Sequence, residues 1–67
     1  MRVNPDRFEM AKANACMSNR DIRAIAKISD VSLTRIGKGR GETRPQNVGR
    51  IAQALGVSVE YLIGEAQ

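Results

Sequence analysis

Hydrophobic residues recur at helical spacing along the whole chain of 67 residues. Apolar side chains three, four and seven positions apart share one face of a helix, whereas a half-buried strand alternates apolar and polar residues. No stretch of this sequence sustains such an alternation. We therefore predict an all-α fold in which several short helices pack their apolar faces together. The predicted core residues are Ile22, Ile25, Leu33, Ile36, Val48, Ile51, Leu55 and Leu62.

Residues suited to helix starts and ends divide this pattern into five helices. Starts are expected at Asn4-Pro5, Ser18, Ser29, Pro45 and Ser58. Asn and Ser side chains accept hydrogen bonds from the free N–H groups of a first turn, and proline fits the first helical position. Ser18 and Asp21 also have the spacing of a capping box, with Asp in place of the usual Glu. We expect the first helix to close at Met17 and the fourth to end before Gly56. The glycine-rich segment GKGRGETRP, residues 37–45, is expected to be a loop.

The length is that of one domain, residues 1–67, with a small core, since a chain this short buries only about 60% of its unfolded surface. The net charge is +4 and the pI is about 10. The charge is uneven: residues 18–50 hold eight Lys and Arg against three Asp and Glu, and residues 51–67 hold two Glu and no base. A basic middle segment favours an anionic partner that faces one side of the domain.

The composition argues against several kinds of chemistry. The chain has no histidine and a single cysteine, Cys16, so it lacks a Cys/His zinc site and a Cys–His nucleophile. We predict no catalytic residues, no metal, no cofactor and no small-molecule ligand, and we expect Cys16 to be a half-buried hydrophobe on a helix. No apolar run approaches the roughly 20 residues that span a bilayer. The first ten residues contain no hydrophobic stretch of the signal-peptide type, so we expect a cytoplasmic protein without membrane partners.

The third predicted helix has an unusual outer face. At about 100° per residue, Leu33 and Ile36 define the buried direction, and Val31, Thr34, Arg35 and Lys38 lie opposite to it. A plain solvated face would normally carry Glu and Lys there and would not expose a valine. Arginine reads guanine O6 and N7, and an apolar group contacts the thymine methyl. The pattern therefore favours a helix that enters the major groove of DNA.

Two segments resemble one family. Residues 18–39, SNRDIRAIAKISDVSLTRIGKG, resemble the helix-turn-helix of the phage repressor/Cro-type (Xre family) regulators. Residues 50–65, RIAQALGVSVEYLIGE, resemble the fourth and fifth helices of that family. The resemblance implies a compact five-helix, lambda-repressor-like domain with the helix-turn-helix at about residues 19–38. It also implies a sequence-specific regulator of transcription that binds a palindromic double-stranded DNA operator as a homodimer. This regulator is expected to be a repressor.

The resemblance also assigns DNA-contacting residues. Base contacts are expected from Asp30, Val31, Ser32, Thr34 and Arg35. Phosphate contacts are expected from Asn19, Lys38, Arg40, Arg44, Gln46 and Asn47. Asp30 would accept a hydrogen bond from a cytosine N4 amine, or it could simply favour the positive end of its helix. Arg35 could instead pair with Asp30, and Val31 could contact a dimer mate.

The sequence departs from the family pattern at four positions. Arg23 stands where a small residue is common, and Lys27 replaces the glycine of the turn, so it is expected to adopt a positive φ. Lys12 and Gly37 stand where family members often have a buried Arg–Glu pair. Two alternatives remain open: an antitoxin-type protein, or an adaptor, in which binding to a protein partner is primary.

Overall fold

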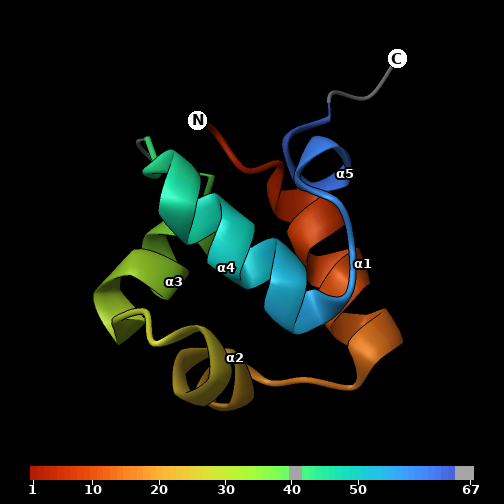
Figure 1. The fold of residues 1–67 in the computed structure, drawn as a ribbon, viewed down its shortest axis with the longest axis vertical. Coiled ribbons are helices and arrows are strands. Elements are labelled where there is room, and N and C mark those ends of the chain that lie inside the picture. Colours follow the sequence, from red (N-terminus) through yellow and green to blue (C-terminus); the bar gives the residue numbers. More distant parts are fainter. Residues whose placement is uncertain (40–41, 65–67) are drawn as a thin grey trace.

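Five helices joined by short connections make up the part of the chain that the structure, a computed structural model, describes: residues 1–39 and 42–64 (Figure 1). The helices are α1 (Pro5–Ala15), α2 (Asn19–Ala26), α3 (Asp30–Gly37), α4 (Pro45–Leu55) and α5 (Val59–Ile63). Within these two ranges every regular element is a helix, which confirms the predicted all-α, five-helix fold. None of the described helices is long and apolar enough to cross a membrane.

The helix starts form where the capping residues predict them. The side-chain caps are Asn4 for α1, Ser18 for α2, Ser29 for α3 and Ser58 for α5. The capping box of α2 is complete: the Asp21 N–H donates to Ser18 Oγ at 3.3 Å, and the Ser18 N–H donates to Asp21 Oδ2 at 3.0 Å. Each of these bonds spans only three residues, so the local sequence is enough to specify them.

The first helix ends two residues earlier than expected. Cys16 takes a left-handed conformation with a φ of 55° and stops α1 at Ala15, while the Met17 N–H bonds back to the Lys12 carbonyl at 3.0 Å. The Cys16 side chain is exposed at this corner, so the prediction of a half-buried thiol on a helix is wrong. Gly56 ends α4 with a φ of 72°, as predicted.

The turn between α2 and α3 confirms the expectation for Lys27. This residue has a φ of 58° and a ψ of 48°, and its N–H closes the helix on the Arg23 carbonyl at 2.9 Å. A residue with a Cβ pays about 1–2 kcal/mol for this left-handed conformation. The chain then turns inward, and Ile28 becomes part of the core. The turn that joins α2 to α3 thus holds a strained lysine at a position where glycine would be free of strain.

The core lies where α1, α2 and α5 meet α4 and where α3 packs on α1 and α2. Helix α4 runs across the front of the molecule and packs against α1, α2 and α5, while α3 packs on α1 and α2 (Figure 1). Seven of the eight predicted core residues are buried; Val3, Phe8, Ala11, Ala26, Ile28 and Ala52 join them. The result is an apolar centre built from aliphatic side chains around a single phenylalanine.

Ile25 is the exception, and the prediction that it belongs to the core is wrong. Its side chain is 56% exposed, whereas Ile22 and Ala26 on the same helix are buried. Ile25 lies about 60° from Ile22 around the helix axis, on the side away from Ala26. Helix α4 covers the Ile22–Ala26 side, so a helix of only two turns buries a narrower strip than its apolar spacing suggests.

The N-terminal residues fasten α5 to the rest of the domain. The Asn4 N–H donates to the Leu62 carbonyl at 2.7 Å, and its Nδ2 donates to the Gly64 carbonyl at 3.0 Å. Arg7 Nη1 donates to the Tyr61 carbonyl at 3.2 Å, and its guanidinium lies 5.0 Å from the centre of the Tyr61 ring. A helix of five residues is not stable alone, so these contacts explain how α5 is held.

Candidate nucleic-acid interface

The outward face of α3 has the composition that the sequence predicts. Leu33 and Ile36 are buried at 0% and 4% exposure, which turns the opposite side of the helix to solvent. On that side Val31 is 69% exposed, and Thr34 and Arg35 are exposed beside it. A valine this exposed on a two-turn helix gains nothing from folding. The face therefore combines an apolar group, a hydroxyl and a cation without burying any of them.

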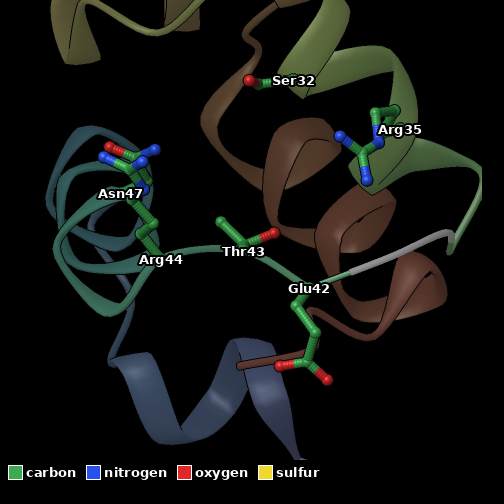
Figure 2. A pocket seen from close by; sticks show the side chains of 6 residues that line it. All are labelled: Ser32, Arg35, Glu42, Thr43, Arg44 and Asn47. Carbon is green, nitrogen blue, oxygen red and sulfur yellow. The ribbon is translucent and has the colours of Figure 1, made fainter.

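A hollow of about 170 Å³ adjoins this face, between α3 and the start of α4. Its walls are Ser32, Arg35, Glu42, Thr43, Arg44 and Asn47 (Figure 2). Ser32 and Arg35 come from α3, Arg44 is the N-cap of α4, and Asn47 lies in the first turn of α4. Glu42 and Thr43, which precede Arg44, complete the lining. The fold thus brings together four residues for which the sequence predicted base or phosphate contacts.

The electrostatics of the hollow favour an anion. Arg35 and Arg44 both line it, and the single acid among the lining residues, Glu42, has a partner elsewhere: the amino group of Met1 donates to Glu42 Oε2 at 3.1 Å. The Glu42 carboxylate points away from Ser32 and Arg35 in Figure 2. The acid therefore cancels little of the positive charge at this place.

The start of α4 adds to this positive potential. Within the described residues α4 is the only helix without a side-chain cap, because Arg44 occupies its N-cap position and cannot accept a hydrogen bond there. An uncapped first turn keeps the partial positive charge of the helix N-terminus, and first-turn N–H groups bind phosphate oxygens. Pro45 at the first helical position removes one of these donors without weakening the helix.

Ser32 is held in place as a hydroxyl donor toward the hollow. Ser29 Oγ donates to Ser32 Oγ at 3.0 Å, and the Ser32 N–H donates to Ser29 Oγ at 3.2 Å. Because Ser32 Oγ accepts a hydrogen bond from Ser29, the Ser32 hydroxyl can still donate its own hydrogen to another acceptor. A phosphate oxygen or a base edge in the hollow would meet that donor.

Asn19 lies apart from the hollow, at the first residue of α2. Lys12 Nζ donates to Asn19 Oδ1 at 2.8 Å and to Glu9 Oε2 at 3.0 Å, and it lies 5.0 Å from the centre of the Phe8 ring. The Lys12 side chain is only 15% exposed, so it holds the amide oxygen of Asn19 inward. The Nδ2 amine is then the outward end of that amide, as a phosphate contact requires.

The remaining predicted phosphate contacts are not gathered at the hollow. Lys38 lines a different depression together with Arg2 and Pro5. Gln46 lies along an open groove between α4 and α5, beside Arg50. Arg40, also predicted to contact phosphate, lies outside the described residues. The structure thus brings Arg44 and Asn47 together at the hollow and places Lys38 and Gln46 at other depressions.

Asp30 has a partner that the sequence interpretation missed. Arg23 Nη1 donates to Asp30 Oδ2 at 2.6 Å, and both side chains remain open to solvent. The alternative pairing of Asp30 with Arg35 is therefore not the one that the structure contains. The sequence did mark position 23 as unusual, because an arginine stands there and the family that the chain resembles commonly has a small residue at this position. The sequence interpretation also did not include Thr43, which lines the hollow.

This surface can bind a ligand rich in oxygen acceptors, because it offers guanidinium, amide, hydroxyl and backbone N–H donors around an apolar spot. Within residues 1–39 and 42–64, no three acidic, cysteine or histidine side chains gather at a distance suited to a metal ion. Comparisons of the chain with protein-family models, with curated proteins and with solved structures found no match. The function of this surface is therefore inferred from the geometry and charge of the protein itself.

Proposed function

We propose that this domain is a sequence-specific double-stranded-DNA-binding regulator of transcription, most simply a repressor, which inserts α3 into the major groove. One observation carries the proposal: the exposed face of α3 borders a positively charged hollow that continues onto the uncapped start of α4. The groups proposed to read bases and to bind phosphates thus share one surface, and the major groove of DNA presents base edges flanked by phosphates.

In this arrangement the α3 residues read the bases. The major groove is about 12 Å wide and admits one helix. Arg35 would donate two parallel hydrogen bonds to guanine O6 and N7, and Val31 would contact a thymine methyl. Thr34 and Ser32 supply hydroxyl groups that serve as donors or acceptors. A good bidentate contact discriminates against a wrong base by about 1–3 kcal/mol, so Arg35 would supply the largest single share of specificity.

The flanking residues would fix the position of α3 on the duplex. Arg44, Asn47 and the first turn of α4 would hold a phosphate on one side of the helix, and Asn19 would hold another at the start of α2. Such contacts carry no sequence information, but they set register and orientation. They also release counterions, so each lowers the affinity as salt rises.

The size of the domain suits a dimer on a palindromic operator. Its dimensions are 31 × 23 × 19 Å, and half-sites on one face of DNA lie roughly 34–36 Å apart. Two copies therefore fit on successive turns without overlap. A single small module buries little DNA surface, so a homodimer would supply the affinity that a repressor needs. In this role the protein would act in the cytoplasm.

The test is selection of bound sequences from a pool of random duplexes, followed by binding measurements at several salt concentrations. We expect an enriched palindrome and an affinity that falls linearly with salt on a log–log plot. An antitoxin-type protein or an adaptor that does not use DNA would enrich no sequence and show no salt slope, and that result would overturn the proposal.

Two substitutions separate the roles of the surface. Arg35→Ala is expected to lower binding to the selected sequence about 10-fold or more while changing binding to random DNA little. Arg44→Ala should weaken both and reduce the salt slope by about one. Arg50→Ala is the matched control, because it removes the same charge from the part of α4 that faces the α4–α5 groove. Equal losses from all three variants would contradict the assigned roles.

A further inference from the structure

An ion pair joins the last turn of α2 to the first residue of α3. Arg23 Nη1 lies 2.6 Å from Asp30 Oδ2, across the turn at Lys27. The side chains of Arg23 and Asp30 are 45% and 65% exposed. Exposed pairs of this kind contribute little to folding, so stabilisation alone is a weak reason to place an arginine and an aspartate here.

The pair holds a guanidinium at the leading edge of the exposed α3 face. Asp30 is the first residue of α3, and its neighbour Val31 is the most exposed large hydrophobe that the structure describes. A guanidinium carries five N–H donors in a rigid plane, and the bond to Asp30 uses one of them. The remaining donors stay near the first residue of α3, because the bond to the Asp30 carboxylate restricts the rotation of the long side chain.

We propose that Arg23 contacts DNA directly and that Asp30 is its positioning residue, an inference that rests on the DNA-binding function proposed above. The ligand is a pair of adjacent oxygen or nitrogen acceptors, either guanine O6 and N7 or two oxygens of one phosphate. An arginine that is already held by a carboxylate loses less side-chain entropy when it binds than a free one. Arg23 therefore extends the reading surface from α3 onto α2.

This inference changes the role expected for Asp30. One carboxylate oxygen already accepts from Arg23, and the guanidinium compensates the negative charge that would otherwise repel nearby phosphates. Asp30 then acts through Arg23 and need not accept from a cytosine amine. A lysine at position 23 would not replace the arginine, because an ammonium lacks the planar pair of donors that engages two acceptors at once.

The experiment is a double-mutant cycle on DNA binding. The wild-type protein is first used to select its sequence; failure to enrich one would overturn the DNA-binding proposal and this inference with it. Affinities are then measured for Arg23→Gln, Asp30→Asn and the double variant. We expect about a 10-fold loss for Arg23→Gln, a smaller loss for Asp30→Asn, and a double variant no weaker than Arg23→Gln alone. Additive losses, or a loss from Asp30→Asn only, would overturn the inference.

Repeating the selection with Arg23→Gln identifies the acceptor. Loss of preference at one guanine, with an unchanged salt slope, indicates a base contact. A uniform loss on all sequences, with a salt slope lower by about one, indicates a phosphate contact. Arg20→Gln is the matched control, because it removes the same charge from an exposed position on the same helix. Equal effects from Arg20→Gln and Arg23→Gln would overturn a specific role for Arg23.

A charge-reversed pair separates positioning from simple bridging. Arg23→Asp combined with Asp30→Arg restores an ion pair between α2 and α3 but moves the guanidinium onto the other helix. The proposal expects the thermal unfolding midpoint to stay near the wild-type value while the affinity for the selected sequence is low. Recovery of full affinity in this variant would show that the pair only bridges the helices.

Discussion

Replacing Lys27 by glycine should stabilise the domain. The left-handed conformation costs a residue with a Cβ about 1–2 kcal/mol, and Lys27 has a φ of 58°. Glycine would remove this cost, but it loses about 0.5–1 kcal/mol more backbone entropy on folding. The Lys27 side chain is exposed and forms no ion pair with any described residue, and its N–H bond to the Arg23 carbonyl would remain. The net gain is therefore roughly 0.5–1 kcal/mol.

The assay is thermal and urea unfolding of the wild type, Lys27→Gly and Lys27→Ala. For a domain of this size the expected gain raises the Tm by about 2–8 °C. Lys27→Ala is the matched control, because it removes the same side chain and charge but keeps the Cβ and hence the strain. We expect Lys27→Ala to stay within about 0.5 kcal/mol of the wild type. If the glycine variant were no more stable than the alanine variant, the turn would not hold the strain that the φ angle indicates.

Three further predictions concern packing, helix propensity and the support of Asn19. Ile22→Ala should lower the free energy of unfolding by about 2–5 kcal/mol, whereas Ile25→Ala should change it by less than about 0.5 kcal/mol, as urea unfolding would show. Gly49→Ala should raise the Tm by about 4–8 °C, because a Cβ there has nothing within 4 Å and alanine favours a helix interior by about 1 kcal/mol. Lys12→Met should lower the free energy of unfolding by about 1–2 kcal/mol and should also weaken DNA binding. A double-mutant cycle with Asn19→Ala tests whether Lys12 acts through Asn19. Additive losses of DNA affinity in this cycle would contradict the support that we assign to Lys12.

The helix-turn-helix shows how far sequence patterns reach in this protein. The start of α3 after Ser29, its inward residues and its exposed Val31 and Arg35 follow from capping and helical periodicity. The positive φ of Lys27 was expected from the family resemblance, because Lys27 stands where that family has the glycine of the turn. The pairing of Arg23 with Asp30 does not follow, because these residues are seven positions apart and their distance depends on the angle at which α2 meets α3.

The same distinction holds at the hollow. The sequence predicts phosphate contacts at Arg44 and Asn47 through the family resemblance, and it indicates a loop before them. It does not reveal that the start of α4 lies beside Ser32 and Arg35, or that the amino group of Met1 engages Glu42. Both facts depend on where the start of α4 and the N-terminus lie relative to α3, and no local rule determines that arrangement.

The sequence by itself determined the number of helices and where each begins, because a helix start depends on hydrogen bonds between residues only two to three positions apart. It also determined most of the core, since a strip of apolar residues has no other favourable place in a chain this small. Only the tertiary structure decided that Ile25 stays outside while Val3 and Ile28 are buried. The reason is physical: burial depends on which neighbouring helix covers a face, and contacts between helices depend on crossing angles that no single helix contains. The same crossing angles place Arg23 beside Asp30, so they also decide which charged side chains lie together on the proposed DNA-binding surface.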